Sequence, residues 1–314
     1  MINRELIRIK VVQLTYAYYQ NGNHNLENAE KELLFSLDKA YDLYNYLLDL
    51  MVAVTRVARQ HYDVAMVRYQ RGEGEKPSAC FAENKFILQL EENKMLSEWK
   101  EHQRQTWDDD INVVRDIFNA IEKSEMYADY MSGQEEKTYA EDRELWRKLY
   151  KIFIVDNDEL TALLEEKSLY WNDDKDIIDT FVIKTIKRFD EANGASQELL
   201  PAYKDIEDRE FAVRLFRTTI LNADQYQRYM TTSSRNWDFS RLAYMDVVIM
   251  QIAIAEMLSF PAIPVSVTIN EYVDLAKIYS TPKSWRYING MLDSIARYLS
   301  ESGKMLKPLP ERKE

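Results

Sequence analysis

The chain has 314 residues, of which 46% are hydrophobic, so it can bury a core as one large domain or two small ones. Its formal net charge of −12 argues against a general nucleic-acid binder. The charge is uneven, because residues 1–20 hold three Lys or Arg against one acid and residues 241–314 hold nine against eight. We therefore expect any RNA contact to lie at the two ends of the chain, away from the acidic middle.

Composition also bounds the fold and the compartment. Glycine and proline number seven each, and scarce turn formers favour long helices over sheet. Cys80 is the single cysteine, so no internal disulfide forms, and no apolar run approaches the roughly 18 residues that span a bilayer. Arg4, Arg8 and Lys10 interrupt the N-terminal apolar pattern, which is unlike a signal peptide. We expect a cytoplasmic protein that does not enter a membrane.

Helical periodicity dominates the first two thirds of the chain. Residues 2–20 place Ile7, Val11, Leu14 and Tyr18 on one buried stripe. The following helices are predicted at 26–69, 83–105, 108–131, 139–168 and 174–191. Asn193, Gly194 and Pro201 mark a linker.

The last third is predicted to form four more helices. Asp208 is a candidate cap for a helix that runs to Met230. In the next helix, 242–258, the residues Met245, Val248, Ile249 and Ile252 share a face. Pro264 suits the start of the third helix, which buries Ile269, Tyr272, Val273 and Ala276, and the fourth buries Ile288, Leu292, Ile295 and Leu299. The chain is therefore expected to be all-α.

A short connection between the last two predicted helices concentrates chemistry that suits RNA. Lys283, Ser284, Arg286 and Tyr287 stand within five positions. Phosphate is bound by Lys and Arg, and an unstacked base accepts an aromatic face. Trp285 and Tyr287 have an alternative interpretation as core anchors at a helix start. We favour that interpretation for Trp285 and base stacking for Tyr287.

The segment Arg241–Ala296 resembles the C-terminal half of the NusB transcription antitermination family. The matching pieces are RLAYMDVVIMQIAIAEML, the turn that ends in Ile263-Pro264, VTINEYVDLAK and SWRYINGMLDSIA. The N-terminal helix matches in Arg8, Val12, Gln13 and Tyr16. The resemblance implies a NusB-like helical bundle formed by residues 1–20 and 205–300, enlarged by an inserted set of long acidic helices over 21–204. Residues 301–314 are expected to form a flexible tail.

The resemblance also implies a function and its residues. NusB proteins bind the single-stranded boxA RNA element together with the small-subunit ribosomal protein NusE, and the complex helps RNA polymerase to read through terminators in ribosomal RNA operons. Arg4 and Arg8 match basic positions of the family's N-terminal helix, and the Lys283–Tyr287 connection with Asn289 lies where the family contacts RNA. Tyr16 and Asp246 match positions that face NusE.

Catalysis is not expected. His24, His61 and His102 lack metal-ligand spacing, and the chain has no Gly-rich phosphate loop, so we predict no metal, cofactor or small-molecule substrate. Acidic runs such as Asp108–Asp110 lack the spacing of a calcium loop. A second hypothesis is an acidic protein-interaction scaffold in a transcription or ribosome-assembly complex. A third, an appendage of an RNA methyltransferase, is disfavoured because no Gly-rich strand–helix signature follows residue 296.

Overall fold

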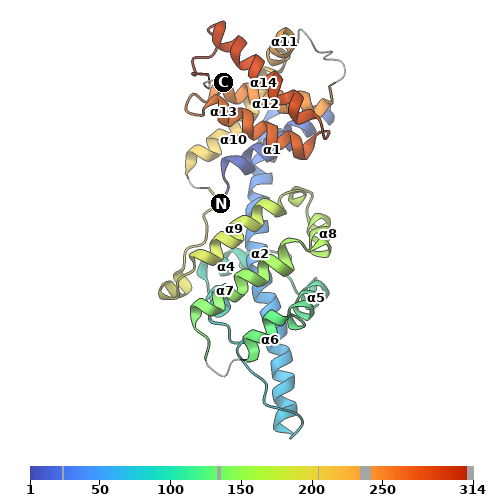
Figure 1. Cartoon of the computed structure of the whole chain (residues 1–314), viewed down its shortest axis with the longest axis vertical. Helices are drawn as coiled ribbons and strands as arrows, with labels where there is room; N and C mark the ends of the chain where they lie inside the picture. The colour runs from blue at the N-terminus through green and yellow to red at the C-terminus, as the bar shows by residue number, and fades with distance from the viewer. Residues whose placement is uncertain (23–24, 133–135, 204, 234–241, 310–314) are drawn as a thin grey trace. The chain divides into compact units, whose positions relative to one another are not determined.

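The computed structural model describes residues 1–22, 25–132, 136–203, 205–233 and 242–309. Within these ranges the chain is helical, and its only β pairing is an isolated bridge between Ile2 and Tyr203, which confirms the predicted all-α class. The chain divides into two compact units, which are described separately. Unit 1 comprises Met1 and Asp38–Ala202, and unit 2 comprises Ile2–Leu37 and Tyr203–Glu314. Figure 1 shows the helices of both.

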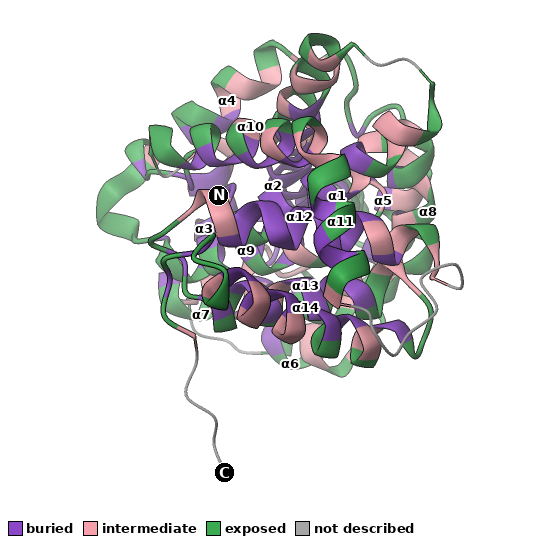
Figure 2. Cartoon of the chain, turned by 90° about the horizontal axis from the view of Figure 1, so that it is seen from above, coloured by how far each residue is buried: buried purple, intermediate pink, exposed green. Residues whose placement is uncertain are grey.

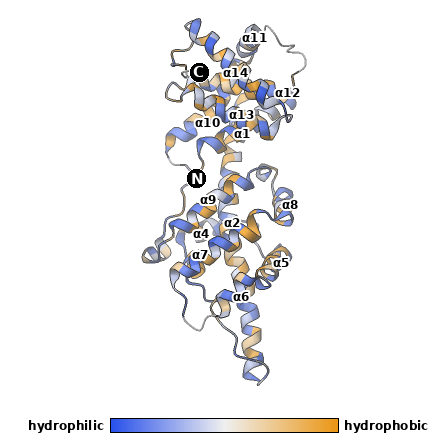
Figure 3. Ribbon diagram, viewed as in Figure 1, coloured by the Kyte–Doolittle hydropathy of each residue, from blue (hydrophilic) through white to orange (hydrophobic). Residues whose placement is uncertain are grey.

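Unit 1 holds most of the long helix α2 and the elements that follow it. The helix α2 runs unbroken from Leu26 to Gln70, as predicted, and its residues from Asp38 onward belong to this unit. The α-helices that follow are α3 (Lys85–Glu91), α4 (Lys94–Glu101), α5 (Ile111–Glu122), α6 (Glu125–Ser132), α7 (Tyr139–Tyr150), α8 (Asp158–Lys167) and α9 (Lys175–Arg188). A π-helix spans Lys151–Val155, and 3-10 turns span Leu169–Trp171 and Glu191–Ser196. Polar and apolar residues alternate along α2 in Figure 3.

Several helices of unit 1 are shorter than predicted because asparagines begin new ones. The predicted helix 83–105 is two helices, since the side chains of Asn84 and Asn93 each accept a hydrogen bond, from Ile87 N and Leu96 N, both at 3.1 Å. Asn157 likewise begins α8 within the predicted helix 139–168. An asparagine oxygen satisfies a free N–H of the first turn, which makes these positions natural helix starts.

Unit 2 is a bundle built around one buried helix. Its elements are α1 (Arg4–Gln20), the start of α2, α10 (Ile206–Leu221), α11 (Ala223–Ser233), α12 (Tyr244–Ser259), α13 (Val265–Tyr279) and α14 (Ser284–Glu301). The helix α12 packs against α1, α10, α11, α13 and α14. Its residues from Val248 to Met257 are all buried, as the purple ribbon of α12 in Figure 2 shows.

The boundaries in unit 2 agree with the prediction for α12 but not for α10. The predicted helix 208–230 is two helices that meet at Asn222, whose side chain donates to Thr218 O at 2.9 Å. The prediction that Asp208 caps this region was wrong, because Asp205 is the cap and accepts from the backbone N–H of Asp208. In α12, Met245 is only partly buried, whereas the other three predicted core residues are fully buried. The predicted core residues of α13 and α14 are all buried.

Part of the predicted flexible tail packs against the bundle. Met305 is 5% exposed and Lys307 is 8% exposed, so the chain is held in place over these residues. The ammonium of Lys307 donates to the backbone carbonyl of Glu256 at 3.3 Å. Residues 310–314 of that predicted tail lie outside the described residues.

Candidate nucleic-acid interface

The predicted basic connection joins the end of α13 to the start of α14. The helix α13 ends at Tyr279, where the N–H of Ser280 donates to Ala276 O, and Lys283 occupies the N-cap position of α14. Of the four residues predicted for the connection, Lys283 alone lies in it. Ser284, Arg286 and Tyr287 lie in the first turn of α14, so the candidate surface is a helix start as well as a loop.

Asp246, in the first turn of α12, anchors this connection to the core. Its carboxylate is 3% exposed and accepts hydrogen bonds from the hydroxyls of Ser280 and Ser284, the latter at 2.9 Å. Ser284 also shares a hydrogen bond of 2.7 Å with the hydroxyl of Thr281. Ser284 was predicted to bind RNA and Asp246 to face a partner protein. The geometry instead gives both residues the role of holding the connection in place.

The outward face of the helix start carries the charged groups. Lys283, Arg286 and Asn289 are exposed, whereas Tyr287 is half-buried beside Asp246. Burial raises the pKa of the Tyr287 hydroxyl above its ordinary value, and the negative charge of Asp246 raises it further. The Tyr287 side chain is therefore neutral, which suits a stacking surface.

Trp285 is half-buried, and cations lie against its ring. The ammonium of Lys277 is 5.5 Å from the ring centroid and the guanidinium carbon of Arg286 is 5.1 Å from it. Distances within about 6 Å allow a cation–π attraction of order 0.5–1 kcal/mol at an exposed site. Trp285 thus holds the two cations near the helix start, and the interpretation of Trp285 as a buried core anchor describes it only in part.

Tyr16 belongs to the same neighbourhood through a second aromatic residue. Its ring, 36% exposed, packs edge-on against Tyr244 at a centroid distance of 5.7 Å. Tyr244 is 45% exposed and stands two residues before the anchor Asp246 in α12. Sequence reasoning did not select Tyr244, although a tyrosine at the start of an otherwise apolar helix is a recognisable signal. The pair forms an exposed aromatic edge.

Arg4 lies at the opposite end of α1 from this edge. Its guanidinium is 3.7 Å from the carboxylate of Asp208 and 5.1 Å from the centroid of the Phe211 ring. Gln13, nine residues along the helix, donates to the hydroxyl of Tyr279 at 3.2 Å, beside the connection. Nine residues of helix span about 13 Å. The structure therefore does not bring Arg4 together with the Lys283–Tyr287 segment.

Arg8 is part of the core of unit 2. It is 4% exposed and donates to both carboxylate oxygens of Glu256, from Nε at 2.8 Å and from Nη2 at 3.0 Å. Nη1 donates to Glu271 at 3.1 Å. Burial lowers the pKa of Arg8, but the hydrogen bonds and charge of Glu256 outweigh that effect, so the guanidinium stays charged. A side chain so engaged has no free face for RNA, and the geometry does not support the predicted contact.

Glu256 is the centre of this buried polar cluster. It is fully buried in α12 and also accepts from the hydroxyls of Thr268 at 2.8 Å and Tyr272 at 3.0 Å. Buried charges are stable only when they are paired and hydrogen-bonded, and this carboxylate has four donors. The cluster therefore connects α1 and α13 to α12. It thereby fixes the packing of the helices that carry the candidate surface.

The described residues show neither a metal site nor a membrane-spanning helix. They contain no group of three or more His, Cys, Asp or Glu that is arranged to hold a metal ion. Among the histidines, His24 lies outside the described residues. None of the described helices combines the length and apolar character that crossing a bilayer requires.

Comparison with known proteins finds relatives over the part of the chain that carries this surface. The model of the NusB family matches residues 176–297, which include α12, the anchored connection and most of α14. The transcription antitermination protein NusB of Salinibacter ruber is 30% identical over 132 residues, covering 40% of this chain and 82% of that protein. The NusB of Geotalea daltonii is 33% identical over 137 residues, covering 43% of this chain and 90% of that protein. The NusB of Chloroherpeton thalassium is 36% identical over 116 residues, covering 35% of this chain and 55% of that protein.

The helical bundle and these matches place the chain in a class of helical transcription antitermination proteins. The chain belongs to the NusB family, a family of non-enzymatic antitermination factors. The relatives cover less than half of this chain, and most of unit 1 lies outside the matched residues. No solved structure matches the chain significantly.

Proposed function

We propose that the chain is an RNA-binding transcription antitermination factor of the cytoplasm. It binds boxA-type single-stranded RNA together with the ribosomal protein NusE, and the complex promotes read-through in ribosomal RNA operons. The observation that carries the proposal is the anchored helix start, where Lys283, Arg286 and Tyr287 are displayed together by the tether to Asp246. Two exposed cations near an aromatic side chain suit a phosphate and its unstacked base.

The residues divide into those that touch RNA and those that position them. Lys283 and Arg286 bind phosphate, Tyr287 stacks on a base, and Asn289, exposed on the same helix, donates or accepts a base-edge hydrogen bond. Ser284 acts through the tether. RNA binding by Arg4 remains a separate prediction, since Arg4 lies at the far end of α1 and would bind a phosphate distant from the helix start. Arg8 is not part of the proposed interface, because its side chain is buried against Glu256.

The partner surface proposed for NusE is the exposed aromatic edge. Tyr16 and Tyr244 present two rings beside the anchor Asp246. Tyrosine is enriched where one protein binds another, because it offers a large apolar body and a polar tip. RNA and protein would then meet at adjoining parts of one surface.

A second function, protein docking by unit 1, is favoured by one observation. The last turns of α2 expose Val64, Val67 and Tyr69, at 55%, 46% and 40%. Apolar side chains on an exposed helix end are typical of a helix that a partner covers. Such a role for the predicted elaboration would add to RNA binding and would not replace it.

The test is a fluorescence titration of labelled boxA-like RNA with and without NusE. Tyr287→Leu keeps the half-buried packing but removes the stacking face, which should weaken binding about fivefold to a hundredfold. Tyr287→Phe should bind as the parent does. Arg147→Ala is the matched control, since Arg147 is a helical arginine paired with an acid in α7 of unit 1. The proposal is wrong if Tyr287→Leu and Lys283→Ala both bind RNA like the parent.

A further inference from the structure

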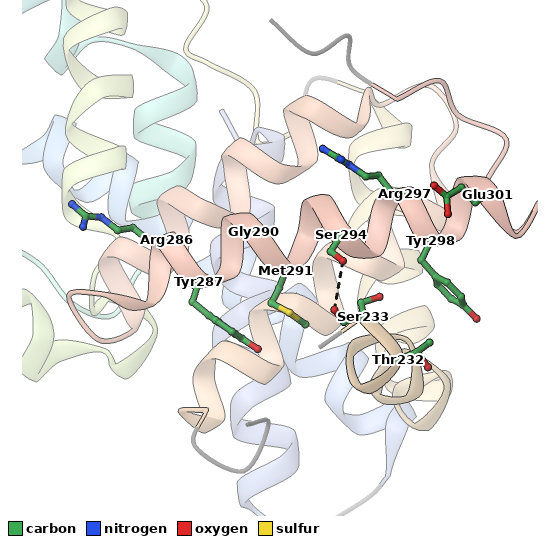
Figure 4. Close-up of a pocket in the computed structure, with 10 residues that line it drawn as sticks. All are labelled: Thr232, Ser233, Arg286, Tyr287, Gly290, Met291, Ser294, Arg297, Tyr298 and Glu301. Carbon is green, nitrogen blue, oxygen red and sulfur yellow. Dashed lines mark hydrogen bonds between the residues drawn. The ribbon is translucent and has the colours of Figure 1, made fainter. Parts of the chain in front are cut away.

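A groove of about 620 Å³ lies between α14 and the end of α11, next to the candidate interface (Figure 4). Its lining residues come from one face of α14 and from the last turn of α11. They are Thr232, Ser233, Arg286, Tyr287, Gly290, Met291, Ser294, Arg297, Tyr298 and Glu301. The groove therefore begins at Arg286 and Tyr287, which the proposed RNA site already includes, and continues past them.

The α14 side of the groove is made of two parallel rows. Arg286, Gly290 and Arg297 form one row, and the other runs from Tyr287 through Ser294 to Tyr298. In each row the two ends are eleven residues apart, which is close to three full turns, so they share a face about 16 Å apart. Each end of the groove thus has an arginine and a tyrosine at consecutive positions of α14, and in Figure 4 the two tyrosines extend to the side of Ser233 and the two arginines to the other side of the helix.

The middle of the groove is open and polar. A Cβ atom added to Gly290 would meet no heavy atom within 4 Å, so the missing side chain leaves free space over the helix. On the facing helix, the hydroxyl of Ser233 is buried and makes no hydrogen bond to any described residue. The hydroxyl of Ser294 reaches only a weak hydrogen bond, at 3.5 Å, to the carbonyl of Ser233. A polar ligand in the groove can therefore displace the weak hydrogen bond of Ser294.

The far end has its own cations. Arg297 is paired with Asp293 at 2.6 Å, and both side chains are more than a third exposed. An exposed pair of this kind is worth only about 0–1 kcal/mol, so a phosphate can compete for the arginine. Lys304 donates to the hydroxyl of Tyr298 at 2.9 Å and lies 4.8 Å from its ring centroid. Asp293 and Glu301 balance the charges of Arg297 and Lys304, so this end carries no net charge and offers two exposed cations for which a phosphate competes.

We infer that this groove is a second part of the RNA path, in which single-stranded RNA continues from the helix start along α14. Phosphates would bind Arg286 and Arg297, bases would stack on Tyr287 and Tyr298, and the backbone would pass over Gly290. The inference rests on the proposed function and extends it, since it assigns the α14 face beyond Asn289 to RNA. A 16 Å path is long enough for several nucleotides of an extended strand.

The test compares a short RNA that fills only the helix start with RNAs extended by four nucleotides at the 5′ or the 3′ end. One extended RNA should bind the parent about tenfold more tightly, the effect of one further stacked base. Arg297→Ala should lose most of this gain and Gly290→Leu should lose all of it by filling the groove. Gly290→Ala should keep most of the gain, since its Cβ meets open space. Arg147→Ala, the control in unit 1, should keep the whole gain.

The outcomes separate the inference from the proposed function. If the parent gains nothing from either extension while the short RNA binds, the groove is not part of the path and the proposed function stands. If the gain survives both Arg297→Ala and Gly290→Leu, the extended strand runs elsewhere and the inference is overturned. If neither RNA binds the parent, both fail. Hydrogen exchange of α14 should confirm that each variant is folded.

Discussion

Replacing Arg8 with methionine tests whether this residue acts through the fold or through RNA. The change removes two hydrogen bonds, at 2.8 and 3.0 Å, from a carboxylate that is fully buried. Removing one partner of a buried ion pair costs about 3–5 kcal/mol, because the remaining charge is left without compensation. Thr268 and Tyr272 still donate to Glu256, so we expect a loss near the lower limit, about 3 kcal/mol.

Amide hydrogen exchange of the α12 peptides is the appropriate assay, because it reports the stability of unit 2 alone. The double variant Arg8→Met/Glu256→Leu removes both charges and should recover much of the loss, whereas Arg8→Lys should fall between the parent and Arg8→Met. RNA affinity of the folded Arg8→Met protein should match the parent. A loss below about 1 kcal/mol, or RNA binding that disappears while α12 stays protected, would refute the structural role assigned to Arg8.

Three further predictions concern other groups of unit 2. Lys283→Ala should weaken RNA binding to every sequence about equally and reduce the slope of log affinity against log salt by about one, measured in a salt titration. Burial lowers the pKa of Lys307, so its ammonium destabilises the folded state at neutral pH. Lys307→Met should therefore be more stable than the parent at neutral pH, as measured by urea unfolding. This difference in stability should disappear as the pH rises from the lowered pKa of the folded state to the unfolded value of about 10.4. A difference that grows with pH would contradict the prediction. Asp246→Ala leaves two serine hydroxyls without their acceptor and should cost about 1–3 kcal/mol, seen as faster exchange of the amides at residues 280–284.

The helices around the candidate site were predictable because their signals are local. The apolar periodicity of α13 and α14 and the proline that precedes Val265 lie within a few residues of the features they determine. In unit 1 the same reasoning joined short helices into long ones. The caps Asn93 and Asn157 are local signals too, but the apolar pattern continues across them and conceals the breaks.

The roles of individual polar residues were not predictable in the same way. Arg8 and Glu256 are 248 positions apart, and no periodicity indicates that a fold brings them together. Ser284 and Asp246, 38 positions apart, form a tether for the same reason. An arginine that binds phosphate and one that neutralises a buried carboxylate look identical in sequence. Burial separates them, and burial follows from the packing of the whole bundle.

The tether between Asp246 and Ser284 makes the candidate interface part of the same cooperative unit as α12. A ligand bound to the folded helix start would therefore stabilise all of unit 2, by about 2.7 kcal/mol when its free concentration is a hundred times its dissociation constant. Slower exchange would then extend from residues 280–284 into the buried turns of α12. RNA binding at the interface can therefore be measured in unlabelled protein by the hydrogen exchange of α12, a helix that the RNA does not contact.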